Sequence, residues 1–147
     1  MNMRPIRGIC LIAGLMLAAY AVLVSVQPAK TRADQFVIYN GIPYEVQQTK
    51  IDFATAADHQ LAPSVTGYRV VVLFIGFTCT GGANTVTMEN LADDSDITGA
   101  MGFAQYGGWA PSCGVWGCFE TDVSSGLEME LSAATSVDGV IRYIYVP

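Results

Sequence analysis

Apolar positions along this chain follow two different patterns. Residues 8–26 form a run of nineteen residues without charge, and Arg4 and Arg7 precede it, which is typical of a membrane-inserting segment. From residue 36 onward, short β-branched and alternating runs are separated by glycine-rich turns, and this pattern predicts strands. The longest run, residues 68–77, carries Arg69 as its one charge. A strand that is apolar on both faces must be covered on both faces, so we expect it in the middle of a sheet.

The remaining runs complete an all-β domain of eight or nine strands over residues 34–147. We expect a single β-sandwich of jelly-roll type, preceded by a hydrophobic helix in residues 1–33. An Asn40-Gly41 pair between two of the runs predicts a hairpin turn. The other predicted strands cover residues 36–39, 42–47, 51–55, 84–89, 116–123, 127–131 and 140–146, with residues 60–65 as an edge strand or a connection.

Two interpretations of residues 1–33 stay open. As a signal peptide, the segment would be cleaved after the small residue Ala33. As an uncleaved anchor, residues 8–26 would extend about 28 Å as a helix, enough to cross a bilayer. Both interpretations predict that the domain is exported, either secreted or membrane-anchored.

The charge of the domain excludes one class of partner. Residues 34–147 contain Lys50, Arg69 and Arg142 against thirteen acidic residues, which is a formal charge of −10. A domain of this charge repels phosphate backbones, so we expect no binding to nucleic acid.

Residues that could carry catalysis are few. His59 is the one histidine of the chain, so any triad would have to include it, and we interpret it as a solvent-exposed turn residue. Glu128 and Glu130 are spaced as outward-facing residues of one strand, which solvent exposure alone explains. We therefore expect a protein that is not an enzyme and needs no cofactor.

An acidic turn is a weak candidate for a calcium site. Asp93, Asp94 and Asp96 could present carboxylates to a Ca²⁺ ion, but the turn lacks the glycine and the distal glutamate of an EF-hand loop. An acidic turn at the end of a strand also needs no metal ion.

Three cysteines lie in the exported part. In an oxidising compartment we expect two of Cys79, Cys113 and Cys118 to pair. A Cys113–Cys118 bond would close a tight loop, whereas a bond from Cys79 would tie the central strand to the long loop that follows. The pairing stays open.

Aromatic residues gather in the same loop region. Tyr106, Trp109 and Trp116 could stack on sugar rings as a glycan-binding surface, or they could serve as core residues or a subunit interface.

The pattern over residues 49–146 resembles small β-sandwich proteins encoded by tailed phages and prophages. The resemblance lies in strand-and-turn motifs and includes no catalytic or ligand motif. It implies a virion-associated structural role, as a head decoration or a fibre-like attachment. The stretches that carry it are residues 51–56, 68–73, 85–89, 91–108, 119–121, 127–134 and 137–143.

This chain adds an export segment to that pattern. We therefore expect an exported structural domain of a virion or a cell envelope, which acts by self-association as a homo-oligomer or by attachment to a surface. The alternative is a glycan-binding module of the cell envelope.

Overall fold

The computed structural model describes residues 36–111, 113, 114 and 116–147. The chain divides into two compact units, residues 1–34 and residues 35–147. The predicted N-terminal helix and the apolar run 8–26 lie outside the described residues. Within the described part of the chain, no helix has the length and apolarity that crossing a bilayer requires.

Every regular element of the described residues is a strand, which confirms the predicted all-β class. There are twelve strands instead of eight or nine, because the loop-rich segments 95–120 form additional pairings of two or three residues. The strands are β1 (Phe36–Tyr39), β2 (Ile42–Glu45), β3 (Gln47–Phe53), β4 (Asp58–Ala62), β5 (Arg69–Cys79), β6 (Asn84–Asn90), β7 (Ser95–Asp96), β8 (Met101–Phe103), β9 (Gly108–Trp109), β10 (Phe119–Glu120), β11 (Leu127–Leu131) and β12 (Val137–Val146).

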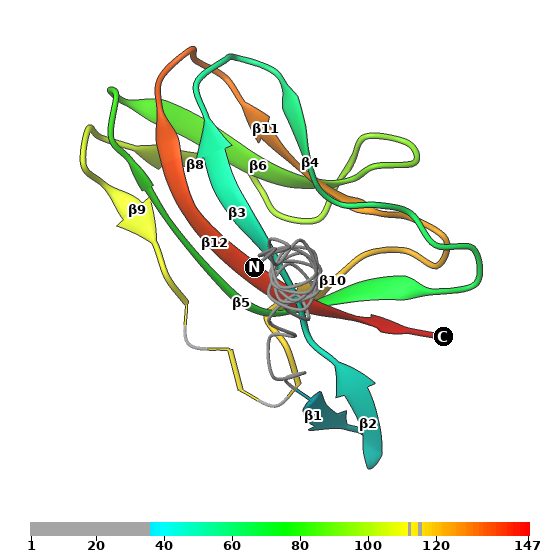
Figure 1. Cartoon of the computed structure of the whole chain (residues 1–147). Coiled ribbons are helices and arrows are strands. Elements are labelled where there is room, and N and C mark those ends of the chain that lie inside the picture. Colours follow the sequence, from blue (N-terminus) through cyan, green and yellow to red (C-terminus); the bar gives the residue numbers. More distant parts are fainter. Residues whose placement is uncertain (1–35, 112, 115) are drawn as a thin grey trace, which may run out of the picture. The chain divides into compact units, whose positions relative to one another are not determined.

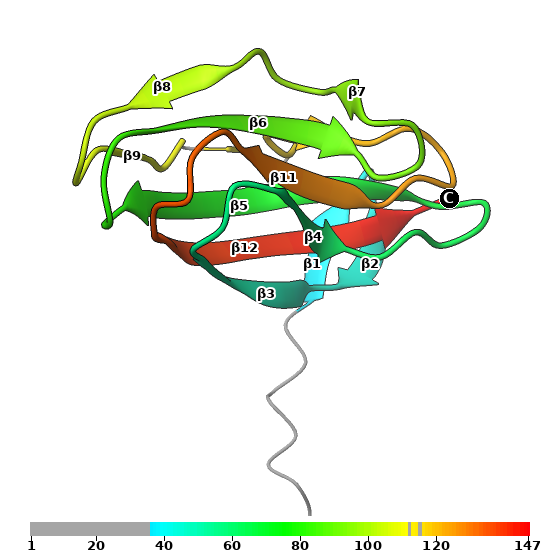
Figure 2. The same ribbon diagram turned by 90° about the horizontal axis from the view of Figure 1, so that it is seen from above.

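The strands form two antiparallel sheets that face each other across one core. The first sheet has the order β10-β5-β12-β3, with β9 also paired to β5, and the second has the order β4-β11-β6-β7, with β8 also paired to β6. Figure 1 shows β4, β6 and β11 on one side of the core and β5 and β12 on the other. Seen from above, the long strands of both sheets run along a common direction (Figure 2).

Strand β5 is the predicted central strand. It pairs with β12 along one edge and with β9 and β10 along the other, and both of its faces are covered. Val70, Val72 and Ile75 point into the main core, while Val71 belongs to a second, smaller cluster on the opposite face. The prediction that this strand is buried on both faces is confirmed for these residues, although Phe74 is exposed on the outer face.

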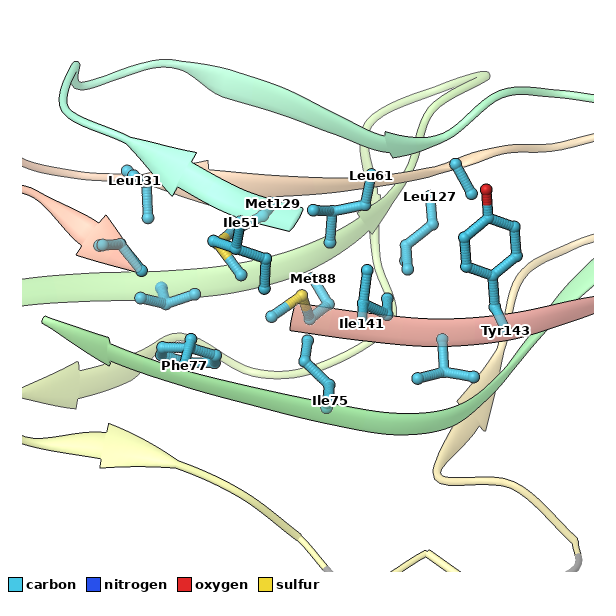
Figure 3. Close-up of a cluster of buried hydrophobic side chains, with 14 of the residues drawn as sticks. Ile51, Leu61, Ile75, Phe77, Met88, Leu127, Met129, Leu131, Ile141 and Tyr143 are labelled. Atoms are coloured by element: carbon cyan, nitrogen blue, oxygen red, sulfur yellow. The ribbon is translucent and has the colours of Figure 1, made fainter. Parts of the chain in front are cut away.

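The main core fills the space between the two sheets. Figure 3 shows side chains from both sheets meeting there, with Met88 and Met129 opposite Ile75 and Ile141. All four side chains are fully buried. This burial supplies most of the driving force for folding, at about 25 cal/mol per Å² of apolar surface removed from water.

Strands β1 and β2 form a hairpin that covers the outer face of the first sheet. Asn40 and Gly41 make its turn with φ values of 49° and 80°, as a two-residue turn of this type requires, so the predicted hairpin is confirmed. Tyr39 of the hairpin packs with Val71 and Ile144 of the sheet.

The predicted strand 116–123 is wrong in its extent. The strand that pairs with β5 is limited to Phe119–Glu120. The disulfide loop ends just before it, at Cys118. After it, Thr121 still donates its N–H to the Val70 carbonyl at 3.0 Å, but its side chain takes the place of its backbone carbonyl as the acceptor. The hydroxyl of Thr121 accepts a hydrogen bond from the Val70 N–H at 2.9 Å. Residues 97–100 form the connection between β7 and β8.

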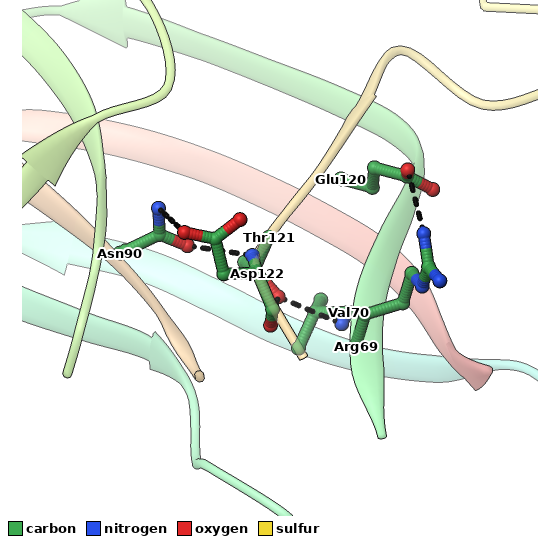
Figure 4. A network of polar contacts seen from close by, with 6 residues as sticks. All are labelled: Arg69, Val70, Asn90, Glu120, Thr121 and Asp122. Atoms are coloured by element: carbon green, nitrogen blue, oxygen red, sulfur yellow. Dashed lines mark hydrogen bonds and ion pairs between the residues drawn. The ribbon is translucent and has the colours of Figure 1, made fainter. Parts of the chain in front are cut away.

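A polar network joins the two sheets at the end where β5 begins (Figure 4). The side-chain amide of Asn90, at the end of β6, accepts a hydrogen bond from the Asp122 N–H at 2.9 Å and donates to the Ser95 hydroxyl at 2.9 Å. Arg69 donates to the Glu120 carboxylate at 2.9 Å. The loop between β10 and β11 is thus held to β6 on one side and to β5 on the other.

Candidate functional site

The three aromatic residues proposed as a ligand surface do not form one platform. Trp109 is half-buried: it stacks on Phe119 with ring centroids 6.3 Å apart and packs edge-on against Phe77. It therefore completes the core instead of presenting a free ring. This packing role was one of the two interpretations of the sequence.

Tyr106 and Trp116 are exposed, at 73% and 74% of their surface, but they lie near opposite ends of β5. The Tyr106 N–H donates to the carbonyl of Cys79, whereas Gly117, the neighbour of Trp116, lies against Val71 and Val72. Seven residues of strand separate these positions, which is about 23 Å. One sugar ring therefore cannot touch both.

The disulfide joins Cys113 to Cys118, with Cα atoms 4.7 Å apart. The prediction that two of three cysteines pair is confirmed, and the tighter of the two candidate loops is the one that forms. Cys79 is free and buried in the main core, where desolvation raises the pKa of its thiol. Backbone hydrogen bonds, instead of a disulfide, connect Cys79 to the start of the long loop, at Tyr106 and Gly107.

The acidic turn does not gather its carboxylates around one point. Asp93 accepts hydrogen bonds from the N–H and the hydroxyl of Ser95. Asp94, in a left-handed conformation with φ of 54°, instead contributes to raising the pKa of the Glu128 carboxyl. Across the described residues, no three His, Cys, Asp or Glu side chains are placed to hold a metal ion.

His59 lies in β4 instead of in a turn. Its ring stacks on Phe53 with centroids 4.1 Å apart, and its Nε2 atom lies 2.9 Å from the carbonyl oxygen of Thr55. These contacts account for the position of the ring without any catalytic role.

Sequence reasoning missed the exposed face of the β1–β2 hairpin. Phe36, Ile38 and Ile42 are exposed at 64%, 69% and 52% of their surface, while their neighbours in the hairpin cover the first sheet. Phe36 and Ile38 point outward, whereas Ile42 is opposite Tyr39 and is exposed beside the turn. We call these three exposed residues the hairpin face. The sequence does contain an indication of this exposed face. The hairpin has apolar residues on both of its sides, and one sheet can cover only one side.

The loop of Trp116 reaches the same part of the molecule. A Cβ atom at Gly117 would lie 2.8 Å from the Val71 side chain, and Val71 also packs against Tyr39 of the hairpin. Gly117 and the hairpin thus both lie against Val71.

Sequence reasoning also misjudged Glu128. This residue was expected to face solvent beside Glu130, but its side chain is only 4% exposed, and that of Glu89 is 6% exposed. The cause is the pairing of β11 with β6, which sets Glu128 directly opposite Glu89. Asp96 of β7 is in turn opposite Glu89, so three carboxyls lie in one row across the outer face of the second sheet.

This row forms part of a larger acidic face. In the next row, Asp58 of β4 is opposite Glu130 of β11. We call these five residues the acidic face: Asp58, Glu89, Asp96, Glu128 and Glu130. Burial raises the pKa of Glu89 and of Glu128 to about 7, and the surrounding carboxylates add to both shifts.

The two sheets differ sharply in charge. The second sheet, with strands β4, β6, β7, β8 and β11, carries the acidic face and no lysine or arginine. The first sheet carries Lys50, Arg69 and Arg142 against Asp52, Glu120 and Asp138. The negative charge of the domain is thus concentrated on one outer face.

Comparisons of the chain with protein-family models, with curated proteins and with solved structures find no match.

Proposed function

We propose that this protein is a non-enzymatic, exported structural domain that self-associates through the hairpin face. The single observation that carries the proposal is the exposure of Phe36 and Ile38 on the outward side of a hairpin whose other side is already packed, with Ile42 exposed beside its turn. Exposed apolar residues that gather in one place mark interaction surfaces in soluble proteins.

A second copy of the chain is the occupant that best fits this surface. Among the described residues of the hairpin only Glu45, directly opposite Phe36, is charged, so a contact between two copies has to leave this carboxylate at its rim. Large aromatic residues such as Phe36 are enriched at such interfaces. A two-fold contact between identical hairpins would bury the apolar residues of both copies.

The strand order supports a jelly-roll topology for the domain. Consecutive strands from β3 to β6 alternate between the two sheets, and β12 returns to lie between β3 and β5. Jelly rolls serve as viral capsid domains and as lectins, so this topology is compatible with the virion or envelope role that the phage resemblance implies. Export is supported by the Cys113–Cys118 disulfide, since such bonds persist in oxidising compartments.

The proposal is tested by the oligomeric state of the exported product. We expect light scattering at micromolar concentration to give a homo-oligomer for the unmodified protein and a monomer for Ile38→Lys, because a buried lysine at the interface would be unpaired. Val123→Lys is the matched control, since Val123 is also an exposed apolar residue but lies in the loop between β10 and β11. It should leave the oligomer intact.

A monomeric unmodified protein would contradict the proposal. So would an Ile38→Lys variant with unchanged mass in solution, which would place the contact on another surface.

Glycan binding is the second candidate, and the exposed ring of Trp116 favours it. Binding on a glycan array that Trp116→Ala abolishes, with an unchanged oligomeric state, would support this role. Tyr106 lies beside the opposite end of β5, at Cys79. Tyr106→Ala should therefore leave such binding unchanged.

A further inference from the structure

The acidic face has a geometry that sequence charge alone does not produce. Glu128 and Glu89 are directly opposite each other on neighbouring strands, and carboxyls in this position repel each other when both are ionised. Asp94, Asp96, Asp58 and Glu130 face the pair from β4, β7, β11 and the turn after β6. Like charges thus surround it from every neighbouring element.

Within the described residues, nothing compensates these charges. The basic residues of the domain, Lys50, Arg69 and Arg142, all lie on the other sheet. In addition, the buried Oε1 atom of Glu128 has no hydrogen-bond partner among the described residues. A buried, unpaired carboxyl oxygen costs free energy, and a donor supplied from outside would remove that cost.

We propose that the acidic face is a docking site for a basic polypeptide segment, and that its cationic side chains pair with Glu89 and Glu128. This proposal is independent of the hairpin face, which lies on the first sheet. The basic segment would be a second partner of the domain, in addition to another copy of the same chain.

The size of the acidic face favours a segment with several cationic side chains. From β4 to β7 the face spans three strand spacings, about 14 Å, and its two rows are about 7 Å apart. A chain with arginine or lysine at several positions matches these dimensions. A single metal ion does not, because no three acidic side chains in the described part converge to hold one.

Docking should release a proton. In the free protein the pKa of each glutamate is about 7, so the pair holds a proton near neutral pH. A guanidinium beside the pair favours the ionised form and lowers both pKa values. Binding and proton release are therefore linked, and the affinity should rise by about tenfold between pH 6 and pH 8 for each carboxyl that loses its proton.

The test uses the disulfide-bonded exported protein and an octa-arginine peptide. Calorimetric titrations at pH 6.5 and low salt, in two buffers of different ionisation enthalpy, give the affinity and the number of protons released. We expect net proton release for the unmodified protein. The double variant Glu89→Gln/Glu128→Gln, whose amides mimic the protonated pair, should release none and bind at least tenfold more weakly.

A matched variant separates docking from general attraction to an acidic protein. Asp52→Asn/Asp138→Asn removes two exposed carboxylates from the other sheet and should change the affinity less than twofold. Equal weakening by the two double variants would overturn the proposal, because it would mean diffuse attraction. Proton release on addition of calcium chloride, but not of the peptide, would also overturn it in favour of a metal site.

Discussion

At the scale of single residues, the Glu89–Glu128 pair links the stability of the domain to pH. The folded state holds these carboxyls at a pKa of about 7, against 4.5 without the surroundings of the fold. Between these values the folded state binds more protons than the unfolded state. The stabilisation from proton binding is thus complete below the unfolded pKa and is lost as the pH rises through 7.

We therefore expect the free energy of unfolding to fall by on the order of 2–3 kcal/mol for each of the two carboxyls between pH 5 and pH 8. Glu128→Gln should flatten this dependence and stabilise the protein at pH 8. Urea denaturation at a series of pH values measures both effects. Glu45→Gln, at an exposed position of β2, is the control, and an equally flattened curve for it would rule out the pair as the cause.

Asn90 is a buried polar residue whose loss should be costly. Its buried amide joins Asp122 and Ser95, so truncation leaves the Asp122 N–H without its acceptor. We expect Asn90→Ala to lower the free energy of unfolding by about 2–3 kcal/mol.

Gln48→Ala removes a comparable amide that bonds Arg142 at the surface, and it should cost less than 0.5 kcal/mol by the usual range for exposed sites. Similar losses for the two variants in chemical denaturation would mean that the network of Asn90 contributes nothing beyond an exposed contact.

Glu128 also shows which features of the outer face could not be predicted from the sequence. The alternation of Leu127, Met129 and Leu131 correctly placed β11 over the core, and it placed Glu128 on the outer face. It could not show that Glu89 is directly opposite, because the register between β6 and β11 depends on chain segments nearly forty residues apart. Glu128 is buried on the outer face because of neighbours on other strands. The sequence around Glu128 contains no pattern that reveals them.

At the scale of elements, β5 and β12 approach each other closely at Gly139. A Cβ atom at Gly139 of β12 would lie 2.1 Å from the Gly76 carbonyl oxygen and 2.7 Å from the Phe77 Cα atom. Both obstacles are backbone atoms, so the two strands would have to separate to admit a methyl group.

We expect Gly139→Ala to destabilise the domain by about 2–4 kcal/mol, in the range for overpacked core sites. Gly102→Ala, in β8, meets no atom within 4 Å and should be neutral in thermal and chemical denaturation. Equal stability of the two variants would mean that β5 and β12 can separate without cost.

The long strands could be predicted at this scale, whereas the short ones could not. Residues 68–77 have enough β-branched and aromatic side chains to specify β5 by themselves. β7, β9 and β10 are pairs of residues held against longer neighbours, so their own composition matters little. The exposure of Trp116 and the packing of Trp109 likewise depend on which loop meets which part of β5.

At the scale of the whole molecule, the cysteines report on both the fold and the N-terminal segment. If residues 1–33 are cleaved as a signal peptide, Cys10 leaves with them. Alkylation of the denatured exported protein should then modify one cysteine, Cys79, before reduction and three after it. Intact mass spectrometry counts the added groups.

Two modified cysteines before reduction, together with a full-length mass, would instead indicate an uncleaved anchor that retains Cys10. Three modified cysteines before reduction in a cleaved product would contradict the Cys113–Cys118 bond.

The separation of charge between the two sheets gives the domain a permanent electric dipole across its thickness. The layer with all three basic residues forms one pole and the acidic face forms the other. Near an anionic surface, such as a bacterial envelope, the field would rotate the domain before any contact forms. The acidic layer would then point away from that surface toward the medium, so that successive molecules arrive with the same orientation.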